Sequence, residues 1–124
     1  MSVTLDIFRA LADPTRLRII ALLRKMELSV GELAQVLGQS QPRVSRHVKI
    51  LCDAGLAVRR KEGSWAFLGT GAPSRVDPLF RAIDHWQAEE GENHWIVADT
   101  ARIAAVHADR AEAAERYFAA RAAQ

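Results

Sequence analysis

The sequence predicts a mainly α-helical fold that carries one two-stranded β-hairpin and ends in a long helix. Three observations predict this fold. Apolar residues recur with helical spacing over most of the chain, in segments separated by capping residues and glycines. Residues 56–68 instead hold two short strand-like runs around a glycine. Residues 94–122 are rich in alanine, which has the best helix propensity.

Length and composition narrow the class of protein. At 124 residues the chain fits one compact domain, and its 49% apolar and 26% charged residues are typical of a folded soluble protein. No apolar run approaches the roughly 18 residues that a membrane-spanning helix needs, and the first residues lack the features of a secretion signal. A single cysteine cannot form an internal disulfide, which fits a reducing compartment. We therefore expect a cytoplasmic protein without a membrane partner.

The first two helices are predicted from an apolar face and from a cap between them. Residues 6–12 place their apolar side chains on one side, which predicts a first helix of about ten residues. Asp13 is a good N-cap, and Pro14 at the first helical position loses no needed N–H. A second helix is therefore expected over residues 14–25, with its arginines mostly outward.

Two further helices joined by a tight turn are predicted next. Ser29 and Glu32 have the spacing of a capping box, in which each side chain accepts a hydrogen bond from the other residue's N–H. Gly38 ends this third helix, residues 39–40 open a fourth, and Gly55 stops it. The inward stripe of the fourth helix is Val44, Val48 and Leu51. This arrangement is the helix-turn-helix pattern.

The outer face of the fourth helix suits contact with double-stranded DNA. Its cations recur at three-residue spacing, away from the apolar stripe. The first turns of a recognition helix meet base edges, where Gln pairs with adenine, Arg with guanine, and Ser with either base or phosphate. The residues expected to contact DNA are Gln41, Arg43, Ser45, Arg46, His47 and Lys49. A packing or hydrogen-bonding role is the alternative for His47.

A basic hairpin follows the fourth helix directly. Residues 56–61 and 64–68 are predicted as two strands around Glu62 and Gly63, because a glycine supplies the positive φ of a tight turn. The residues expected to grip phosphates beside a minor groove are Arg60, Lys61 and Ser64. A basic hairpin after a basic recognition helix is the winged form of the helix-turn-helix.

The charge distribution supports a polyanion partner on one side. Residues 1–71 carry 11 lysines and arginines against 6 acidic residues, whereas residues 72–124 carry 6 against 9. The excess is sharpest in residues 39–64. We expect residues 1–71 to form a winged helix-turn-helix DNA-binding core. We expect residues 72–124 to add C-terminal helices for dimerisation within the same domain.

The C-terminal half is predicted to hold two helices. Residues 76–87 have a helical apolar pattern, residues 89–93 form a polar break, and residues 94–122 form the long helix. This helix is longer than so small a core can cover, so a partner helix is expected to hide part of it. The expected assembly is a homodimer.

These segments resemble the ArsR/SmtB family of bacterial winged-helix repressors. The resemblance is carried by FRALADPTRLRI at 8–19, LAQVLGQSQPRVSRHVKIL at 33–51 and AGLAV at 54–58. It implies a dimer built from the first and last helices, and operator binding that an effector such as a small molecule relieves. The family's DNA-contact positions fall on Gln41, Pro42, Ser45 and Arg46. Pro42 replaces a residue that is often Ser in the family.

The metal sites found in many family members are not matched. Ser29 and Gly31 stand where the family's thiolate site has cysteines, so a soft metal has no ligands there. Along the last helix, Asp99 lacks a histidine two residues on, and His107 lacks an acidic residue or histidine three residues on. We therefore expect no metal site and no cofactor.

A closer likeness is to family members in which the regulator precedes a methyltransferase domain. It is carried by LCDAG at 51–55, GSW at 63–65 and RAEAAERYF at 110–118. The alternative function is therefore the N-terminal regulatory half of a larger SAM-dependent methyltransferase. A third hypothesis, a winged helix that binds only proteins, is opposed by the basic recognition face. No glycine-rich nucleotide loop follows a strand, so this chain itself is not expected to be an enzyme.

Single residues outside these motifs have simple alternatives. Cys52 is either a redox switch through an intersubunit disulfide or a small, semi-buried apolar residue. Arg18 is either a surface charge or a brace for the DNA backbone. The histidines expected to face solvent are His85, His94 and His107. The tryptophans expected to be packing residues rather than a cofactor-binding box are Trp65, Trp86 and Trp95.

Overall fold

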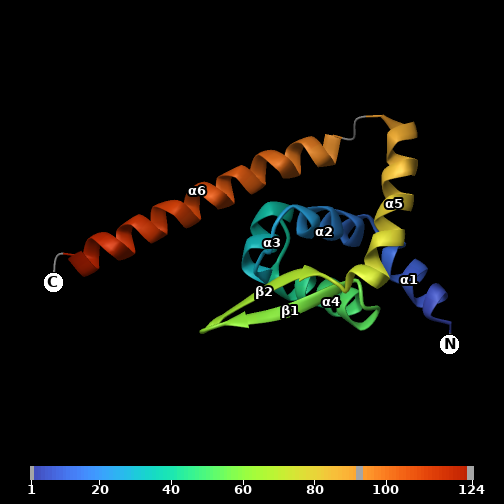
Figure 1. Cartoon of the computed structure of the whole chain (residues 1–124). Coiled ribbons are helices and arrows are strands. Elements are labelled where there is room, and N and C mark those ends of the chain that lie inside the picture. The colour runs from blue at the N-terminus through green and yellow to red at the C-terminus, as the bar shows by residue number, and fades with distance from the viewer. Residues whose placement is uncertain (1, 92–93, 123–124) are drawn as a thin grey trace.

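A computed structural model describes residues 2–91 and 94–122, with side chains for all of these except 94–96. The elements are α1 (Val3–Leu11), α2 (Pro14–Lys25), α3 (Val30–Leu37), α4 (Gln41–Asp53), β1 (Ala57–Glu62), β2 (Trp65–Thr70), α5 (Pro73–Glu90) and α6 (His94–Ala122). In Figure 1, α2 and α3 lie at the centre, with α4 and the hairpin on one side and α6 on the other. The predicted mainly helical fold with one hairpin and a long C-terminal helix is confirmed.

Local capping chemistry sets the helix ends where the sequence predicts them. The Asp13 carboxylate accepts a hydrogen bond from the N–H three residues on, at 3.1 Å. Ser29 and Glu32 form both bonds of the predicted capping box, at 3.0 and 3.1 Å. Gly38 ends α3 in the left-handed conformation, with a φ of 66°. These ends hold α3 and α4 in the helix-turn-helix arrangement.

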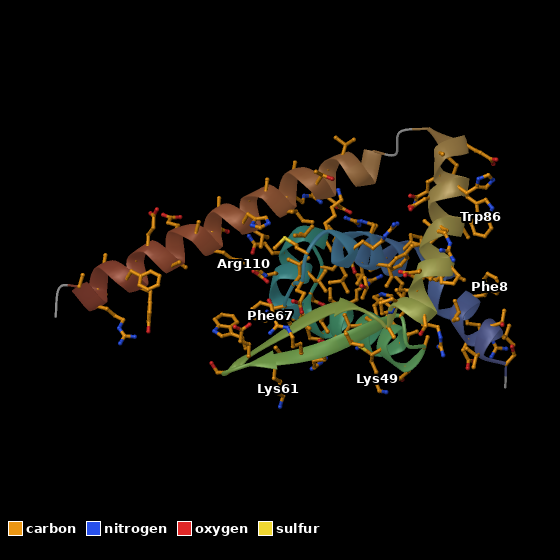
Figure 2. The ribbon with its side chains drawn as sticks, in the orientation of Figure 1. Phe8, Lys49, Lys61, Phe67, Trp86 and Arg110 are labelled. Atoms are coloured by element: carbon orange, nitrogen blue, oxygen red, sulfur yellow. The ribbon has the colours of Figure 1, made fainter. Side chains whose placement is uncertain are left out.

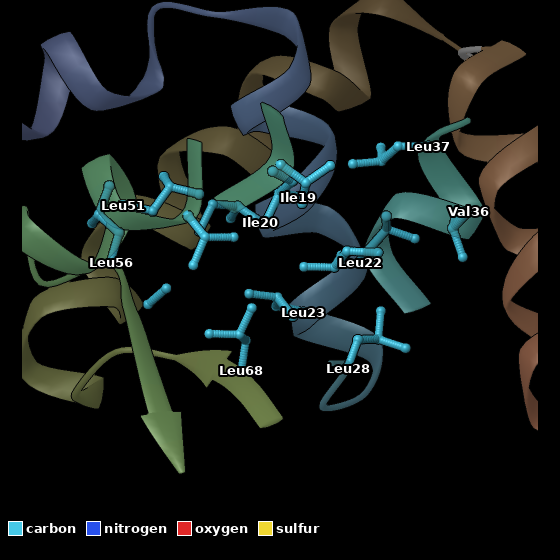
Figure 3. Packing of buried hydrophobic residues seen from close by; sticks show 14 of the residues in the cluster. Ile19, Ile20, Leu22, Leu23, Leu28, Val36, Leu37, Leu51, Leu56 and Leu68 are labelled. Carbon is cyan, nitrogen blue, oxygen red and sulfur yellow. The ribbon is translucent and has the colours of Figure 1, made fainter. Parts of the chain in front are cut away.

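The core is built around α2, which packs against α1, α4, α6 and the hairpin (Figure 3). Its buried residues are Ile19, Ile20, Leu22 and Leu23. The predicted inward stripe of α4, namely Val44, Val48 and Leu51, is fully buried. Burying each such side chain contributes about 1.5–3 kcal/mol to folding. Because this stripe fixes which side of α4 faces inward, it also fixes which side faces outward.

The hairpin turns one residue later than predicted. Glu62 pairs with Trp65, so the two loop residues are Gly63 and Ser64 rather than Glu62 and Gly63. Gly63 has a φ of 61°, which supports the predicted need for glycine in the turn. Apolar alternation locates a hairpin but leaves its turn free to shift by a residue, which explains the difference.

The helix α5 is longer than the predicted 76–87. Pro73 occupies its first turn, where the missing N–H costs nothing. Pro78 lies inside the helix near its start and removes only one backbone hydrogen bond, so the helix continues through it. The expected break begins at Gly91, which has a φ of 79°.

The long helix α6 has the predicted bounds and is covered only over its first half. It crosses α2 and α3, and Ile103 and Val106 are buried there. Every residue from Ala111 to Ala122 is exposed. In Figure 1 this outer half projects beyond the hairpin. The interior of this chain therefore leaves about half of the helix uncovered.

The surroundings of Arg18 and of two tryptophans were not predictable from the local sequence. Arg18 points inward and forms a bidentate ion pair with Asp99, at 2.9 and 3.0 Å, so both expectations for Arg18 were wrong. Trp65 and Trp86 are 64% and 53% exposed in the single chain, and Trp65 packs by stacking on Phe67. The side chain of Trp95 lies outside the described residues.

Candidate nucleic-acid interface

The recognition helix α4 presents its predicted contact residues on one exposed face. Their exposure follows from the buried stripe, since residues at three-residue spacing on the other side of a helix must face solvent. The exposed residues are Gln41, Pro42, Arg43, Ser45, Arg46 and Lys49. Among the described residues, no carboxylate lies within ion-pair distance of Arg43 or Arg46. Lys49 pairs with Asp53 one turn away, at 2.9 Å, which raises the pKa of Lys49.

His47 differs from its neighbours because its ring is engaged inside the protein. Its Nδ1 lies 3.1 Å from an Arg16 guanidinium nitrogen and 4.0 Å from the Asp13 carboxylate. The Arg16 Nε in turn donates to the Ala10 carbonyl at 2.6 Å. Burial alone would raise the pKa of Asp13, but the Arg16 N–H and the Arg16 charge lower it overall. The geometry favours the hydrogen-bonding alternative for His47, which links α4 to the connection between α1 and α2 through Arg16 and Asp13.

The two adjacent cations of the wing point in opposite directions. Arg60 is paired with Phe67 and Lys61 with Ala66, and successive residues of a strand face opposite sides. Figure 2 shows Lys61 pointing to the same side as Lys49, away from α6. Lys61 thus lies on the same side of the molecule as Lys49 of α4 (Figure 2). The alternation of the strand places Arg60 on the other face of the hairpin.

Arg60 is held by acidic residues of the same chain. Its guanidinium donates to Glu27 at 2.9 and 3.2 Å and to Glu62 at 3.0 Å. These hydrogen bonds, the one to Glu27 first, raise the pKa of Arg60. The sequence analysis paired Arg60 with Lys61 because both are basic, but an arginine engaged twice has less charge to offer a phosphate.

Arg59 is a candidate contact residue that was not among the predicted DNA contacts. It is exposed, and it lies on the same face of β1 as Lys61, two residues away. Its charge also acts on Cys52 near the end of α4, which places it beside the recognition helix. The signal that could have found it is strand alternation, because residues i and i+2 share a face. Ser64 lies in the exposed loop at the tip of the wing.

Comparison with known proteins decides the family. Residues 13–58 match the model of bacterial regulatory proteins of the arsR family. The chain is 38% identical over 105 residues to the arsenical resistance operon repressor of Escherichia coli (strain K12), covering 79% of this chain and 85% of that protein. The chain belongs to the ArsR family. It is therefore a DNA-binding transcriptional regulator with a winged helix-turn-helix.

Solved structures of other proteins have the same fold. HlyU from Vibrio cholerae matches with a TM-score of 0.56 and 32% identity, over 64% of this chain and 90% of that one. The homodimeric winged helix-turn-helix domain of a possible ArsR-family regulator from Mycobacterium bovis matches with a TM-score of 0.61. That match has 24% identity and covers 74% of this chain and 87% of that one. At this identity the second likeness shows the fold alone.

In this ArsR-family chain, the positions of the family's metal sites have other roles. Ser29 caps α3, and Asp99 is bound to Arg18. Among the side chains that the structure describes, those of residues 2–91 and 97–122, no group of three or more His, Cys, Asp or Glu is arranged to hold a metal ion. His85 and His107 are exposed, as expected, whereas the side chain of His94 lies outside the described residues. None of the described helices is both long and apolar enough to cross a membrane.

Cys52 of this ArsR-family chain is a half-buried residue packed against the core. Burial raises the pKa of its thiol, only partly opposed by Arg59 and Lys49. Since the thiolate is the reactive form, a raised pKa disfavours oxidation chemistry. The position fits the small apolar residue that was one of the two alternatives.

Proposed function

We propose that this chain is a homodimeric repressor that binds an inverted-repeat operator and is released by a small-molecule effector. The observation that carries the proposal is the common direction of the cations on α4 and on one face of the wing. A recognition helix in the major groove and a wing on the flanking phosphates use these surfaces together. We place the protein in the cytoplasm, without a cofactor.

The test is fluorescence anisotropy with the DNA upstream of the chain's own gene, against a scrambled duplex over a salt series. In a dimer the recognition helices should enter major grooves about 34 Å apart, so the preferred sequence should be an imperfect inverted repeat. Binding at two protomers per site with a large advantage over scrambled DNA supports the proposal. Equal, weak binding to both duplexes contradicts sequence-specific repression.

Arg46→Ala should weaken binding to the preferred sequence by about 1–3 kcal/mol and relax the preference at one base position. Arg46 is exposed in the first turns of α4, where a guanidinium reaches a guanine edge. The measurement is anisotropy on the preferred duplex and on duplexes changed at single positions. Arg116→Ala on the outer half of α6 is the matched control. An equal loss on preferred and scrambled DNA would refute the base-reading role.

Lys61→Ala should reduce the slope of log K against log salt by about one, because one phosphate contact is lost. Arg60→Ala should change the slope less, since Glu27 and Glu62 already neutralise that guanidinium. Both variants are measured on the same duplex between low and moderate salt. Equal slopes for Arg60→Ala and Lys61→Ala would contradict the proposal that only the Lys61 face of the wing contacts phosphates.

We assign the dimer contact to an apolar groove between α1, α2, α5 and the start of α6. Its volume is about 620 Å³. Large apolar residues on its walls include Phe8, Leu11, Leu17, Ile83 and Trp86. Phe8 and Trp86 are more than half exposed in the single chain. An exposed apolar patch of this kind marks an interaction surface, and we propose a second copy of this chain as its occupant.

Phe8→Glu should raise the dimer dissociation constant by at least about tenfold, because a carboxylate would be buried in an apolar contact. Phe118→Glu is the matched control, since Phe118 is 68% exposed on the outer half of α6. Sedimentation equilibrium measures both. A larger effect from Phe118→Glu would move the dimer contact to the outer half of α6.

The alternative function, control of a SAM-dependent methyltransferase domain, is favoured by one observation. The outer half of α6 is exposed from Ala111 to Ala122 and could lead to another domain. A reading frame that continues past Gln124 into a glycine-rich strand–loop–helix would support this alternative. A stop codon after Gln124 would contradict it.

A further inference from the structure

A cluster of charged and aromatic side chains joins α6 to the wing on the face opposite Lys61. We call it the wing clamp, and its members are Glu27, Glu32, Arg60, Phe67 and Arg110. Figure 2 shows Arg110 of α6 and Phe67 of β2 pointing toward one another across the space between the two elements. The clamp therefore connects a helix of the C-terminal half to the outer part of the DNA-binding hairpin.

Arg110 is the centre of the clamp. Its Nε donates to Glu32 at 2.6 Å, and its Nη2 donates to the other oxygen of the same carboxylate and to the Glu27 carbonyl at 3.0 Å. Its guanidinium carbon lies 5.4 Å from the centre of the Phe67 ring, within the range of a cation–π contact. One arginine thus binds the start of α3, the segment before it and the wing.

Arg60 holds the same ring and the same segment from within the wing. Its guanidinium carbon lies 5.6 Å from the Phe67 centre, and it pairs with the Glu27 carboxylate at 2.9 Å. Burial alone would raise the pKa of Glu32, but hydrogen bonds from Arg110 and the Ser29 N–H lower it overall. The carboxylates of the clamp are therefore charged at neutral pH, and the ion pairs are formed.

The outer wing needs such support because an isolated two-stranded hairpin is only marginally stable in water. At the base of the hairpin, Leu28 bridges to Leu68, and Ala57 and Leu68 are buried in the core. From Val58 to Glu62 every residue of β1 is exposed. The clamp acts on this outer part, at the Arg60–Phe67 pair.

We infer that Arg110 is a positioning residue for DNA binding, because through Phe67 and Glu27 it holds the outer wing in the orientation that lets Lys61 reach a phosphate. Arg110 itself lies on the side away from the α4 cations and touches no DNA. Displacing α6 from α3 would remove this hold, loosen the wing and weaken binding. The consequence for DNA rests on the proposed function, whereas the consequence for the wing does not.

The first experiment measures hydrogen exchange of the free protein, without DNA. Arg110→Ala should speed exchange of the β1 and β2 amides near Arg60 and Phe67 by about three- to tenfold, and leave α4 unchanged. Arg116→Ala is the control, because Arg116 pairs only with Glu112 of the same helix among the described residues. Unchanged wing exchange would overturn the inference. Equal acceleration in α4 would also overturn it, since that result reports a general loss of stability.

Phe67→Leu provides a second, independent variant. It removes the aromatic face between the two guanidinium groups but keeps an apolar side chain on β2. The same wing-limited acceleration is expected. If Arg110→Ala speeds hydrogen exchange in the wing and Phe67→Leu does not, the contact between Arg110 and the Phe67 ring does not stabilise the wing. That result would contradict the proposed role of the ring.

The second experiment is a double-mutant cycle of Arg110→Ala and Lys61→Ala. It measures affinity for the DNA upstream of the gene that encodes this chain. Arg110→Ala should lower affinity by about three- to tenfold, and Lys61→Ala should then cost less than it does in the unmodified protein. Additive effects would overturn the coupling. If the unmodified protein does not bind this DNA, the proposed function fails, while the exchange experiment still decides the clamp.

Discussion

Asp99→Ala should destabilise the protein by about 3 kcal/mol, at the low end of the loss expected when one partner of a buried ion pair is removed. Asp99 is 5% exposed, and both its oxygens accept from Arg18. Without the carboxylate, the Arg18 guanidinium would stay mostly buried and lose its two hydrogen bonds to Asp99. The low end is expected because α6 lies at the edge of the fold and can lift to admit water. Urea denaturation followed by circular dichroism measures the loss.

A matched control and a compensating variant make this prediction sharp. Asp109→Ala, on the same helix but exposed, should change stability by no more than about 0.5 kcal/mol. The double variant Arg18→Met with Asp99→Leu should recover most of the loss, because apolar residues of similar size often replace a buried ion pair at little cost. Equal effects of Asp99→Ala and Asp109→Ala would show that the Arg18–Asp99 pair does not hold α6.

Gly71→Ala should destabilise the protein by more than about 3 kcal/mol, a loss of the size that backbone strain or damage to a core produces. A Cβ at this position would lie 2.0 Å from the Gly55 carbonyl oxygen, and backbone cannot move aside cheaply. The Gly71 N–H also donates to the Leu56 carbonyl at 3.0 Å, which fixes the close approach. The variant should show a much lower midpoint in thermal denaturation.

Gly63→Ala distinguishes the effect of a steric clash from the effect of backbone conformation. Gly63 has open space around its Cβ position but a φ of 61°, so alanine there should cost only about 1–2 kcal/mol. A smaller loss from Gly71→Ala than from Gly63→Ala would contradict the assignment of Gly71 to a close approach between the end of β2 and the end of α4.

The helices were predictable because their ends are set by residues within one turn of each other. Asp13 and the Ser29–Glu32 capping box act locally, and the glycine after α3 does the same. The outer face of α4 was predictable for a related reason. A buried stripe with helical spacing leaves only one side for Arg43, Arg46 and the other contact residues.

The wing and the arginines of α2 were not predictable to the same depth, because their partners are distant in sequence. Arg18 meets Asp99 81 positions along the chain, and Arg60 meets Glu27 33 positions back. No local sequence pattern indicates such pairs, so both arginines were expected to be surface cations available to solvent or DNA. The face of Lys61 additionally depends on where the hairpin turns, and the turn was predicted one residue too early.

Arg60 is paired with Phe67, and this register depends on the number of residues in β1. That number determines which face of the hairpin each side chain occupies. Deleting or inserting one residue before Arg60 in β1 would exchange the two sides of the strand. Lys61 would then meet Glu27, and Arg60 would turn toward the α4 side. Arg60 and Lys61 would both still be present, but Lys61 would lie on the face toward α6 and Arg60 on the face proposed to meet DNA. The number of residues between Leu56 and Gly63 can therefore change only by an even number if the two faces of the wing are to keep their roles, whichever residues occupy these positions.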